Sequence, residues 1–571
     1  ATRPVEAAFI GMAALSLLAL AAASYAFDGE YESTQRITND PLSHADAELS
    51  TCLNGPCYPG NEFCGQPFQN APQFHLMDQH GCGENDPNGP VFDPVHGVFH
   101  HFYQIHLAAT PGHGPDYGHF VSKDFVSWAP LPVAIWNGLD SSVWPPKVTP
   151  YDNEAIFTGS AVVVDGAAPD GKSPGVVNIY PGLCNSGSWP ACKTGTLLAQ
   201  AVPANYASDP LLTNWTKPSY NPIMENTQRD PSTPWKTPSG EWRLRTYNSM
   251  VYGAASDGDL LSGKWYTIGK STDFRTCECP SVYPLPAASP GSEAAYAAAS
   301  RAGMPDTVHK TSCGGDWWQL GSYTAGPPKT LGNFSATPGW ADLFAQRRID
   351  QGNFYASKDN EYPTLSGGKR RINWGWATVP PASAQTLPRE VTFNAAARAL
   401  QQYPIDELKT LRGSAVYART GVAVDGALDL ALGAGVARQA ELLITFELPA
   451  TSAKLGVKLS AADALSDALS CEIDFTPGAA HVPVSCGGTA DTLTLLPTET
   501  TVELRLFADW TFIEAYFQKG RVAITKTAAM SEGMGAQLTS STAVVADAFV
   551  YPMKSIWIDP AAVRSAPRVY H

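Results

Sequence analysis

Charged residues are scarce in this chain of 571 residues. Asp, Glu, Lys and Arg form 16% of it, against about 25% in typical globular proteins, which is too little for a coiled coil. The 38 Lys and Arg are outnumbered by 53 Asp and Glu, so the formal charge is −15. No nucleic-acid partner is expected, because binding to phosphates requires basic residues. Disorder is excluded, because hydrophobic residues form 44% of the chain.

Turn-forming residues and tryptophan are abundant instead. The chain has 49 Gly and 47 Pro, together 96 residues, or about 17% against a usual ~12%. It also has 15 Trp, of which 13 precede residue 400. This composition indicates a globular protein rich in strands and turns, and the length fits two or three domains.

The N-terminal region contains one long apolar run. No residue from Ala7 to Phe27 is charged, and a helix of that length spans a bilayer core of ~30 Å. Ser24 and Ala26 also suit cleavage by a signal peptidase before Phe27. The run predicts entry into the secretory pathway, either with a cleaved signal or with a retained type II membrane anchor. The protein would then be extracellular, in the cell wall or in the vacuolar lumen.

Eleven cysteines agree with an oxidising compartment. Four of them cluster early and could form two bridges, whereas zinc binding is less favoured because their spacings are irregular. Local pairs are expected farther on, although sequence does not fix connectivity, and Cys279 is left over as an unpaired thiol. The early cluster is Cys52, Cys57, Cys64 and Cys82, and the local pairs are Cys184 with Cys192, Cys277 with Cys313, and Cys471 with Cys486.

The body of the chain changes character near residue 412. Before it, short apolar segments such as Val98–Tyr103 alternate with Gly, Pro, Asn and Asp, which predicts many short strands in a propeller or sandwich. After it, alternating segments such as Glu441–Leu448 predict half-buried antiparallel strands of a β-sandwich. The Ala/Ser/Pro-rich residues 286–306 are expected to form a surface loop, and 395–412 a short helical bridge. The predicted ranges are a signal or anchor at 1–27, a Cys-containing stalk at 28–70, an aromatic-rich domain at 71–400, a linker at 401–412 and a sandwich at 413–571.

Three carboxylates occur in unusual local sequences. Asp86 lies in Asn-Asp-Pro-Asn-Gly, Asp230 in Arg-Asp-Pro and Glu278 in Cys-Glu-Cys-Pro. Each has an ordinary explanation when taken alone. The first is good turn chemistry, the second fits a surface turn or ion pair, and the third is uninformative.

Taken together and in this order, the three motifs resemble those of glycoside hydrolase family 32, the invertase and fructanase family. The resemblance covers about residues 71–557 and continues between the motifs and into the second domain. Further matching segments are Phe99-His-His-Phe-Tyr-Gln104, Gly118–Asp124, Phe157-Thr-Gly-Ser-Ala161, Asn353-Phe-Tyr-Ala-Ser-Lys358, Arg370–Trp376 and Phe507-Ala-Asp-Trp-Thr-Phe-Ile-Glu514.

The resemblance implies an all-β fold, a five-bladed β-propeller followed by a C-terminal β-sandwich. It also implies a retaining glycosidase without a cofactor, which acts on sucrose or related fructosides. Asp86 would be the nucleophile, Glu278 the general acid/base and Asp230 the stabiliser of the transition state. Arg229 would offset part of the repulsion between these acids.

The same resemblance marks further sugar contacts: Asn85, Gln104, Phe157, Thr158 and Trp376. Amides bind hydroxyl groups and aromatic rings cover the apolar faces of sugars, although core packing is the alternative for Phe157 and Trp376. No metal site is expected. The histidines that could suggest one are better explained by strand alternation and loop spacing, and they are His100, His101, His106, His113 and His119.

Several positions depart from the family pattern near the expected site. Gly83 and Glu84 replace the usual apolar pair before Asn-Asp-Pro-Asn-Gly, Tyr117 replaces a Trp, and Thr158 replaces a Ser. A further expected Trp is missing around Pro111-Gly112. These changes leave the three acids in place and bear on substrate choice.

Three hypotheses about function follow. The first is a β-fructofuranosidase, and the second is a fructan exohydrolase or fructosyltransferase with the same machinery. The third is a catalytically weak sugar-binding protein, which the complete set of acids makes less favoured. The oligomeric state cannot be inferred from the sequence.

Overall fold

The computed structural model describes most of the chain after residue 70. The described ranges are 71–79, 82–106, 115–140, 142–143, 147–184, 195–271, 277–337, 340, 348–461, 469–528, 530–531 and 533–571. The apolar run at 7–27, the stalk and the cysteines before Cys82 lie outside these ranges, so their roles stay predictions. None of the helices in the described ranges is both long enough and apolar enough to cross a bilayer.

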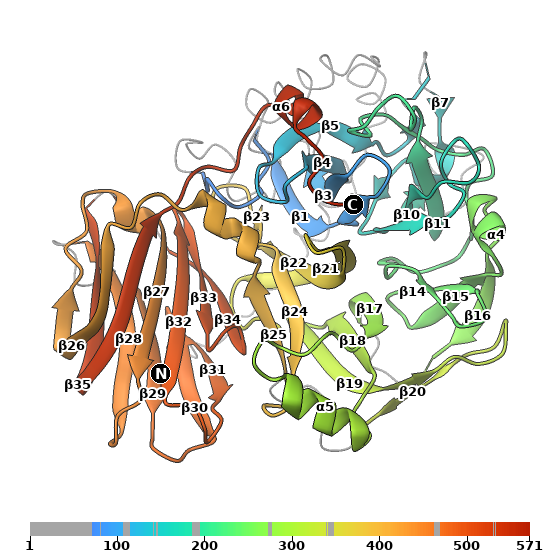
Figure 1. Ribbon diagram of the computed structural model, residues 1–571. Helices are drawn as coiled ribbons and strands as arrows, with labels where there is room; N and C mark the ends of the chain where they lie inside the picture. Colours follow the sequence, from blue (N-terminus) through green and yellow to red (C-terminus); the bar gives the residue numbers. More distant parts are fainter. Residues whose placement is uncertain are drawn as a thin grey trace, which may run out of the picture.

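Five antiparallel sheets are arranged around a common axis as the blades of a β-propeller (Figure 1). The first is built from β1 (Gly83–Pro87), β2 (Val91–Asp93), β3 (Val98–His106), β4 (Asp116–Ser122) and β5 (Ala129–Ile135). The second has β8 (Ala155–Ile156), β9 (Ser160–Val164), β10 (Gly175–Cys184), β11 (Gly195–Pro203) and β12 (Trp215–Thr216). The third has β13 (Trp235–Lys236), β14 (Trp242–Arg245), β15 (Met250–Ala254) and β16 (Tyr266–Lys270).

The fourth and fifth blades complete the ring. The fourth contains β17 (Glu278–Pro284), β18 (Thr307–Ser312), β19 (Asp316–Thr324) and β20 (Asn333–Ala336). The fifth contains β21 (Phe354–Pro363), β22 (Lys369–Ala377), β23 (Ala384–Gln385), β24 (Arg389–Asn394) and β25 (Ala399–Pro404). Strands from the beginning of different blades contact one another, β1 and β17 with β21 and β2 with β9, so these strands line the axis. Residues placed early in each inner strand therefore meet at one end of the axis.

Blade one is packed with aromatic and histidine rings. His100 Nδ1 lies 3.0 Å from His119 Nε2, and the ring of His101 lies 4.6 Å from that of Trp374. Burial lowers the pKa of His100 to about 4 and that of His101 to about 3. These histidines are therefore neutral members of the core near neutral pH.

The second domain is a single ten-stranded antiparallel sheet that folds over its own core. The long strand β35 pairs with β28 through its first half and with β27 through its second half, so it belongs to both layers of the sandwich. The strands are β26 (Tyr417–Asp429), β27 (Gln439–Glu447), β28 (Ala453–Ala461), β29 (Leu469–Phe475), β30 (His481–Cys486), β31 (Thr489–Thr494), β32 (Thr501–Asp509), β33 (Phe512–Phe517), β34 (Val522–Thr527) and β35 (Met534–Pro552). The all-β propeller and sandwich are confirmed.

Short helices and a two-stranded ribbon lie between or after the strands of the blades and the sandwich. Of two expectations about connecting segments, one was wrong and the other was met only in part. Within 286–306, the Ala-rich residues form the exposed helix α5 (Glu293–Arg301), because alanine has the highest helix propensity. Within 395–412, the chain forms β25 and then the 3-10 helix η4 (Asp406–Leu411) instead of one helical bridge. The remaining elements are β6 (Leu139–Asp140), β7 (Lys147–Val148), η3 (Pro150–Asp152), α4 (Asp257–Leu261), η5 (Val436–Arg438) and α6 (Pro560–Ser565).

A buried network of charges joins the sandwich to the propeller. Glu514 on β33 accepts hydrogen bonds from Arg389 of β24 (2.7 Å) and contacts His75 (3.0 Å). Asp509 accepts the backbone N–H of Phe74 at 2.8 Å and contacts the ring of His75 at the same distance. Burial opposes the charge on Glu514, but Arg389 and His75 outweigh it and lower its pKa to about 2. Each buried charge is thus compensated by a partner from the other domain.

Replacing Glu514 should therefore destabilise the two-domain structure. Glu514→Gln is expected to lower the free energy of unfolding by about 3 kcal/mol at pH 6, because Arg389 and His75 lose a buried counter-charge. The stabilisation from Glu514 is complete above its unfolded pKa of about 4.3 and is lost as the pH falls towards 2. The variant should accordingly lose less stability than the wild type between pH 4.5 and 2.5 in urea titrations.

The exposed Glu447→Gln, in the same domain, is the matched control. It is expected to change the free energy of unfolding by less than about 0.5 kcal/mol. Equal losses for the two variants would contradict the assignment of Glu514 as the charge that joins the domains.

Candidate active site

The three predicted acids come from three different blades. Asp86 lies in β1 of blade one, Asp230 precedes β13 of blade three, and Glu278 is the first residue of β17 in blade four. Their places at the early ends of inner strands bring them to the same end of the propeller axis. Asp86 and Asp230, 144 residues apart in the sequence, and Asp230 and Glu278, 48 residues apart, are thereby brought close together.

Cys279 connects the three acids. It directly follows Glu278, its N–H donates to Asp230 Oδ2 at 3.3 Å, and its Sγ lies 3.6 Å from Asp86 Oδ2. The residue is buried and has a φ of 45°, a left-handed conformation that few residues other than glycine adopt. Burial raises the pKa of its thiol well above the usual value, so the sulfur stays protonated. Cys279 is thus a hydrogen-bonding spacer between carboxylates.

Cysteine pairing agrees with the predictions wherever the described residues test it. Cys277 is bonded to Cys313 and Cys471 to Cys486, while Cys279 is a free thiol. Cys184 is also disulfide-bonded, and its predicted partner Cys192 lies outside the described ranges. The Cys277–Cys313 bridge directly precedes the pairing of Glu278 with Ser312, so it fixes the start of β17 to β18.

Asp86 is held by a relay of side chains. Gln104 Nε2 donates to Thr158 Oγ1, and Thr158 Oγ1 donates to Asp86 Oδ2, each at 2.5 Å. The contacts to Thr158 and Cys279 both fall on Oδ2, and no described residue is hydrogen-bonded to Oδ1. Burial raises the pKa of Asp86 to about 6, the bond from Thr158 opposes this rise, and the charge of Glu278 adds to it.

The turn that carries Asp86 explains its sequence motif. Gly89 has a φ of 122°, and a Cβ at this position would lie 2.4 Å from the backbone nitrogen of Ala161 in blade two. Only glycine fits there. The Asn-Asp-Pro-Asn-Gly motif therefore forms a tight turn and also carries one of the three clustered acids.

Asp230 is the most deeply buried of the acids, with 3% of its surface exposed. Its φ is 59°, so it shares the left-handed conformation of Cys279. Burial and the charge of Asp86 raise its pKa to about 7, while Arg229 and Lys358 oppose that rise. Burial and mutual repulsion thus raise the pKa of both Asp86 and Asp230 above the usual values.

Both oxygens of Glu278 have partners. Arg229 donates to Oε1 at 2.5 Å, and Tyr355 donates to Oε2 at 2.7 Å. The guanidinium of Arg229 also stacks on Tyr247, 4.7 Å from the ring centre. Arg229 thus orients Glu278, and its Nε lies 3.8 Å from Asp230 Oδ2.

Sequence reasoning missed two members of this cluster. Tyr355 holds Glu278, and the buried Lys358 donates to Pro231 O at 2.8 Å and to Ser160 Oγ at 3.1 Å. The charge of Lys358 lowers the pKa of both Asp86 and Asp230. A signal was available, since both residues lie in the matching segment 353–358 and a lysine is unusual in a buried strand.

The remaining candidate sugar contacts lie around the acids. Asn85 and Phe157 are half-buried neighbours of Asp86 and Thr158, and the half-buried Trp376 pairs with Tyr355 across β21 and β22. Gln104 is buried and donates a hydrogen bond to Thr158, so it holds the side chain of Thr158 in place. Their contacts with sugar stay predictions.

The departures from the family pattern have structural explanations. Glu84 is buried and accepts the N–H of Asp78 and the amide of Gln385 at 2.7 and 3.1 Å, so its partners are other than the three acids. Burial raises its pKa well above the usual value. Tyr117 donates to the carbonyl of Phe157 at 2.7 Å and thereby supports the segment that carries Thr158. Pro111-Gly112 lies outside the described ranges.

The fold and the site together define a class of glycosidase structure, a five-bladed propeller with three converging carboxylates followed by a sandwich. The chain superposes on fructan 1-exohydrolase IIa from Cichorium intybus with a TM-score of 0.68 and 21% identity, over 86% of this chain and 99% of that one. Exo-inulinase from Aspergillus awamori gives a TM-score of 0.66 and 20% identity, over 86% and 99%.

Family models match both domains. The model of the glycosyl hydrolases family 32 N-terminal domain matches residues 75–404, and that of the family 32 C-terminal domain matches residues 407–551. The chain therefore belongs to glycoside hydrolase family 32.

Sequence relatives agree with this membership. A β-fructofuranosidase, insoluble isoenzyme 1, of Daucus carota is 29% identical over 61% of this chain and 58% of its own length. A fructan 6-exohydrolase of Triticum aestivum is 30% identical over 66% of this chain and 64% of its own length. The similarity thus spans slightly less than two thirds of either relative.

Proposed function

We propose that this protein is a retaining β-fructofuranosidase that releases terminal fructosyl units from sucrose or related fructosides. One observation carries the proposal, namely that Cys279 contacts Asp86 and Asp230 and directly follows Glu278. Retaining glycosidases need two carboxyl groups roughly 5 to 5.5 Å apart. The contacts through Cys279 keep the three carboxylates near one another, and this supports the proposed mechanism.

In the first step, Asp86 attacks the anomeric carbon of the fructosyl unit. Its Oδ1 is the attacking oxygen, because Oδ2 is occupied by Thr158 and Cys279. The bond to the leaving oxygen breaks as Glu278 gives that oxygen a proton, and an ester forms between the fructosyl unit and Asp86. Arg229 and Tyr355 orient Glu278 for this transfer.

In the second step, Glu278 takes a proton from water, which attacks the anomeric carbon and releases Asp86. Asp230 binds ring hydroxyls and stabilises the positive charge that develops on the sugar in both transition states. The buried Lys358 limits the repulsion between Asp86 and Asp230, because its charge favours their ionised forms.

Two finer assignments belong to the same proposal. The relatives bear names of both β-fructofuranosidases and fructan exohydrolases, so fructan hydrolysis is the second candidate and transfer to a sugar hydroxyl the third. The disulfides support folding in the secretory pathway. Residues 7–27 would direct the chain there and, if uncleaved, anchor it as a type II membrane protein.

Replacement of either reacting carboxylate tests the roles. Asp86→Asn and Glu278→Gln should each lower kcat on sucrose by about 10³-fold or more, because each removes a group that acts in the transition state. With a fructoside whose leaving group needs no protonation, Glu278→Gln should regain most of its rate of first-step cleavage, whereas Asp86→Asn should not. Initial rates and stopped-flow bursts measure these effects.

Glu293→Gln on the exposed helix α5 is the control variant and should keep full activity. Full activity of Asp86→Asn or Glu278→Gln would refute the assigned roles.

Substitution of Thr158 tests the electrostatics of Asp86. The acid limb of kcat/KM should lie near pH 6, because Asp86 must be ionised to attack. Thr158→Val removes a hydrogen bond that lowers this pKa, so the limb should move to higher pH by about 0.5 to 1 unit. Thr158→Ser keeps the hydroxyl and should keep the profile, and an unshifted Thr158→Val profile would show that the relay does not tune Asp86.

Product analysis distinguishes the candidate activities. We expect the secreted protein to release fructose from sucrose at mildly acidic pH, as measured by chromatography of products from sucrose, raffinose, inulin and levan. Faster release from inulin or levan would favour the exohydrolase, and chain-lengthened products would favour transfer. Absence of fructose from all four donors would rule out the enzymatic proposals and leave sugar binding.

A further inference from the structure

A cavity lies along the inner strands of the propeller, beyond the three acids in chain direction. It measures about 620 Å³, within the range of small-molecule sites. Its wall comes from residues that follow the acids along the inner strands: Val91 and Phe92 after Asp86, Thr233 to Lys236 after Asp230, and Ser281 and Val282 after Glu278. These lining residues follow the acids by three to six positions, at about 3.3 Å per residue. The cavity is therefore separate from the acid cluster.

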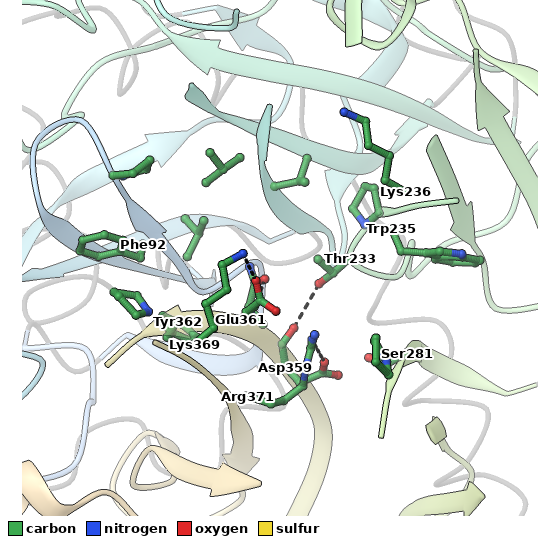
Figure 2. A pocket seen from close by; sticks show the side chains of 18 of the residues that line it. Phe92, Thr233, Trp235, Lys236, Ser281, Asp359, Glu361, Tyr362, Lys369 and Arg371 are labelled. Carbon is green, nitrogen blue, oxygen red and sulfur yellow. Dashed lines mark hydrogen bonds and ion pairs between the residues drawn. The ribbon is translucent and has the colours of Figure 1, made fainter. Parts of the chain in front are cut away.

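The cavity wall combines aromatic rings with polar groups. Figure 2 shows Phe92 and Trp235 on opposite sides, with the side chains of Asp359, Glu361 and Arg371 between them. The indole of Trp242 also lines the cavity. Rings that face a space containing carboxylates and a guanidinium suit a ligand with both apolar faces and hydroxyl groups.

Each Lys, Arg, Asp and Glu side chain in the wall has a partner of opposite charge. Arg371 pairs with Asp359 at 2.7 Å, Lys369 with Glu361 at 2.5 Å, and Lys236 with Asp257 at 2.8 Å. A charged ligand would have to compete with these pairs. A neutral ligand can use their remaining capacity, because a guanidinium has five N–H donors and a carboxylate about four acceptor positions.

Two polar groups of the wall have no partner in the described part of the chain. The Oγ of Ser281, on β17, and the Nε1 of Trp235, on β13, are buried and make no hydrogen bond there. An unpaired buried hydroxyl costs free energy. A ligand hydroxyl that reached it would remove that cost.

We propose that this cavity, which we call the rear cavity, is a second and non-catalytic binding site for a neutral mono- or disaccharide. The sugar ring would lie between the aromatic side chains, and its hydroxyls would bind the Arg371–Asp359 pair and Ser281. The proposal depends on the lining of the rear cavity and not on the reaction at the acid cluster.

Hydrogen–deuterium exchange of the full secreted chain tests the site directly. The Glu278→Gln variant is used as the background, so that sucrose is not consumed, and the probes are glucose, fructose and sucrose. At least one of them should slow exchange at residues 233–236 and 359–371 in a saturable manner. Betaine at the same osmolality is the control, because excluded solutes stabilise proteins without binding.

Two substitutions then separate binding from folding. Ser281→Ala should weaken the apparent affinity about three- to tenfold, the effect of one hydrogen bond, while the Tm stays equal or rises because an unpaired buried hydroxyl is removed. Trp235→Ala should weaken it about tenfold or more through the loss of ring contact. Exchange near residues 157–160 at the acid cluster should be unchanged by both variants.

The proposal is overturned if none of the three sugars slows exchange at 233–236 and 359–371 more than betaine does. It is also overturned if inorganic sulfate protects these segments as well as the sugars do, because the site would then bind anions. Equal affinities of Ser281→Ala, Trp235→Ala and the unsubstituted background would have the same consequence. If the enzyme released no fructose from any donor, only the proposed function would be refuted. The proposal for the rear cavity would still be decided by the exchange experiments.

Discussion

The buried ammonium group of Lys358 is the constraint around which the centre of the propeller is organised. It lies in blade five but donates to Ser160 in blade two and to the carbonyl of Pro231 before blade three. The same charge lowers the pKa of Asp86 and Asp230, which burial and mutual repulsion raise. The same cation therefore contributes to closure of the ring and, together with Arg229 and Thr158, to ionisation of the acids. Without it, the propeller would have to close around two carboxylates that repel each other with less compensation.

The sandwich contributes rigidity to this arrangement. Its strands β32 to β34 are buried on both faces, since Leu504 and Leu506 lie in the sandwich core while Phe507 and Tyr516 pack with propeller residues. Arg389 of blade five bonds to Glu514 and to Asp350, which itself binds Thr525 of β34. Blade five thus lies between the sandwich on one side and the acid cluster on the other, and Lys358 and Tyr355 both belong to it.

Much of the fold and the acid cluster was predictable because the signals are local. The motifs around Asp86, Asp230 and Glu278, the pairing of Cys277 with Cys313, and the strand patterns are each contained in short stretches of sequence. The functions of Lys358 and Tyr355 were not predictable in the same way, because their partners lie in other blades and only closure of the ring brings them together. The lining of the rear cavity escaped detection for the same reason. Helix α5 was missed because its small and polar residues resemble a loop, and alanine propensity decided its structure.

The bridge between Cys277 and Cys313 has a consequence for how this chain can vary. It closes a segment of 36 residues in sequence separation that contains the paired strands β17 and β18 and, in the connection between them, α5. Exposed loop tips are the sites where proteins most readily accept insertions. Because the bridge fixes the strand ends next to the pairing of Glu278 with Ser312, the connection between β17 and β18 can lengthen, shorten or diverge between relatives without moving the carboxylate of Glu278. The bridge thus holds the base of the hairpin that carries Glu278, while the connection at the far end of that hairpin is free to evolve.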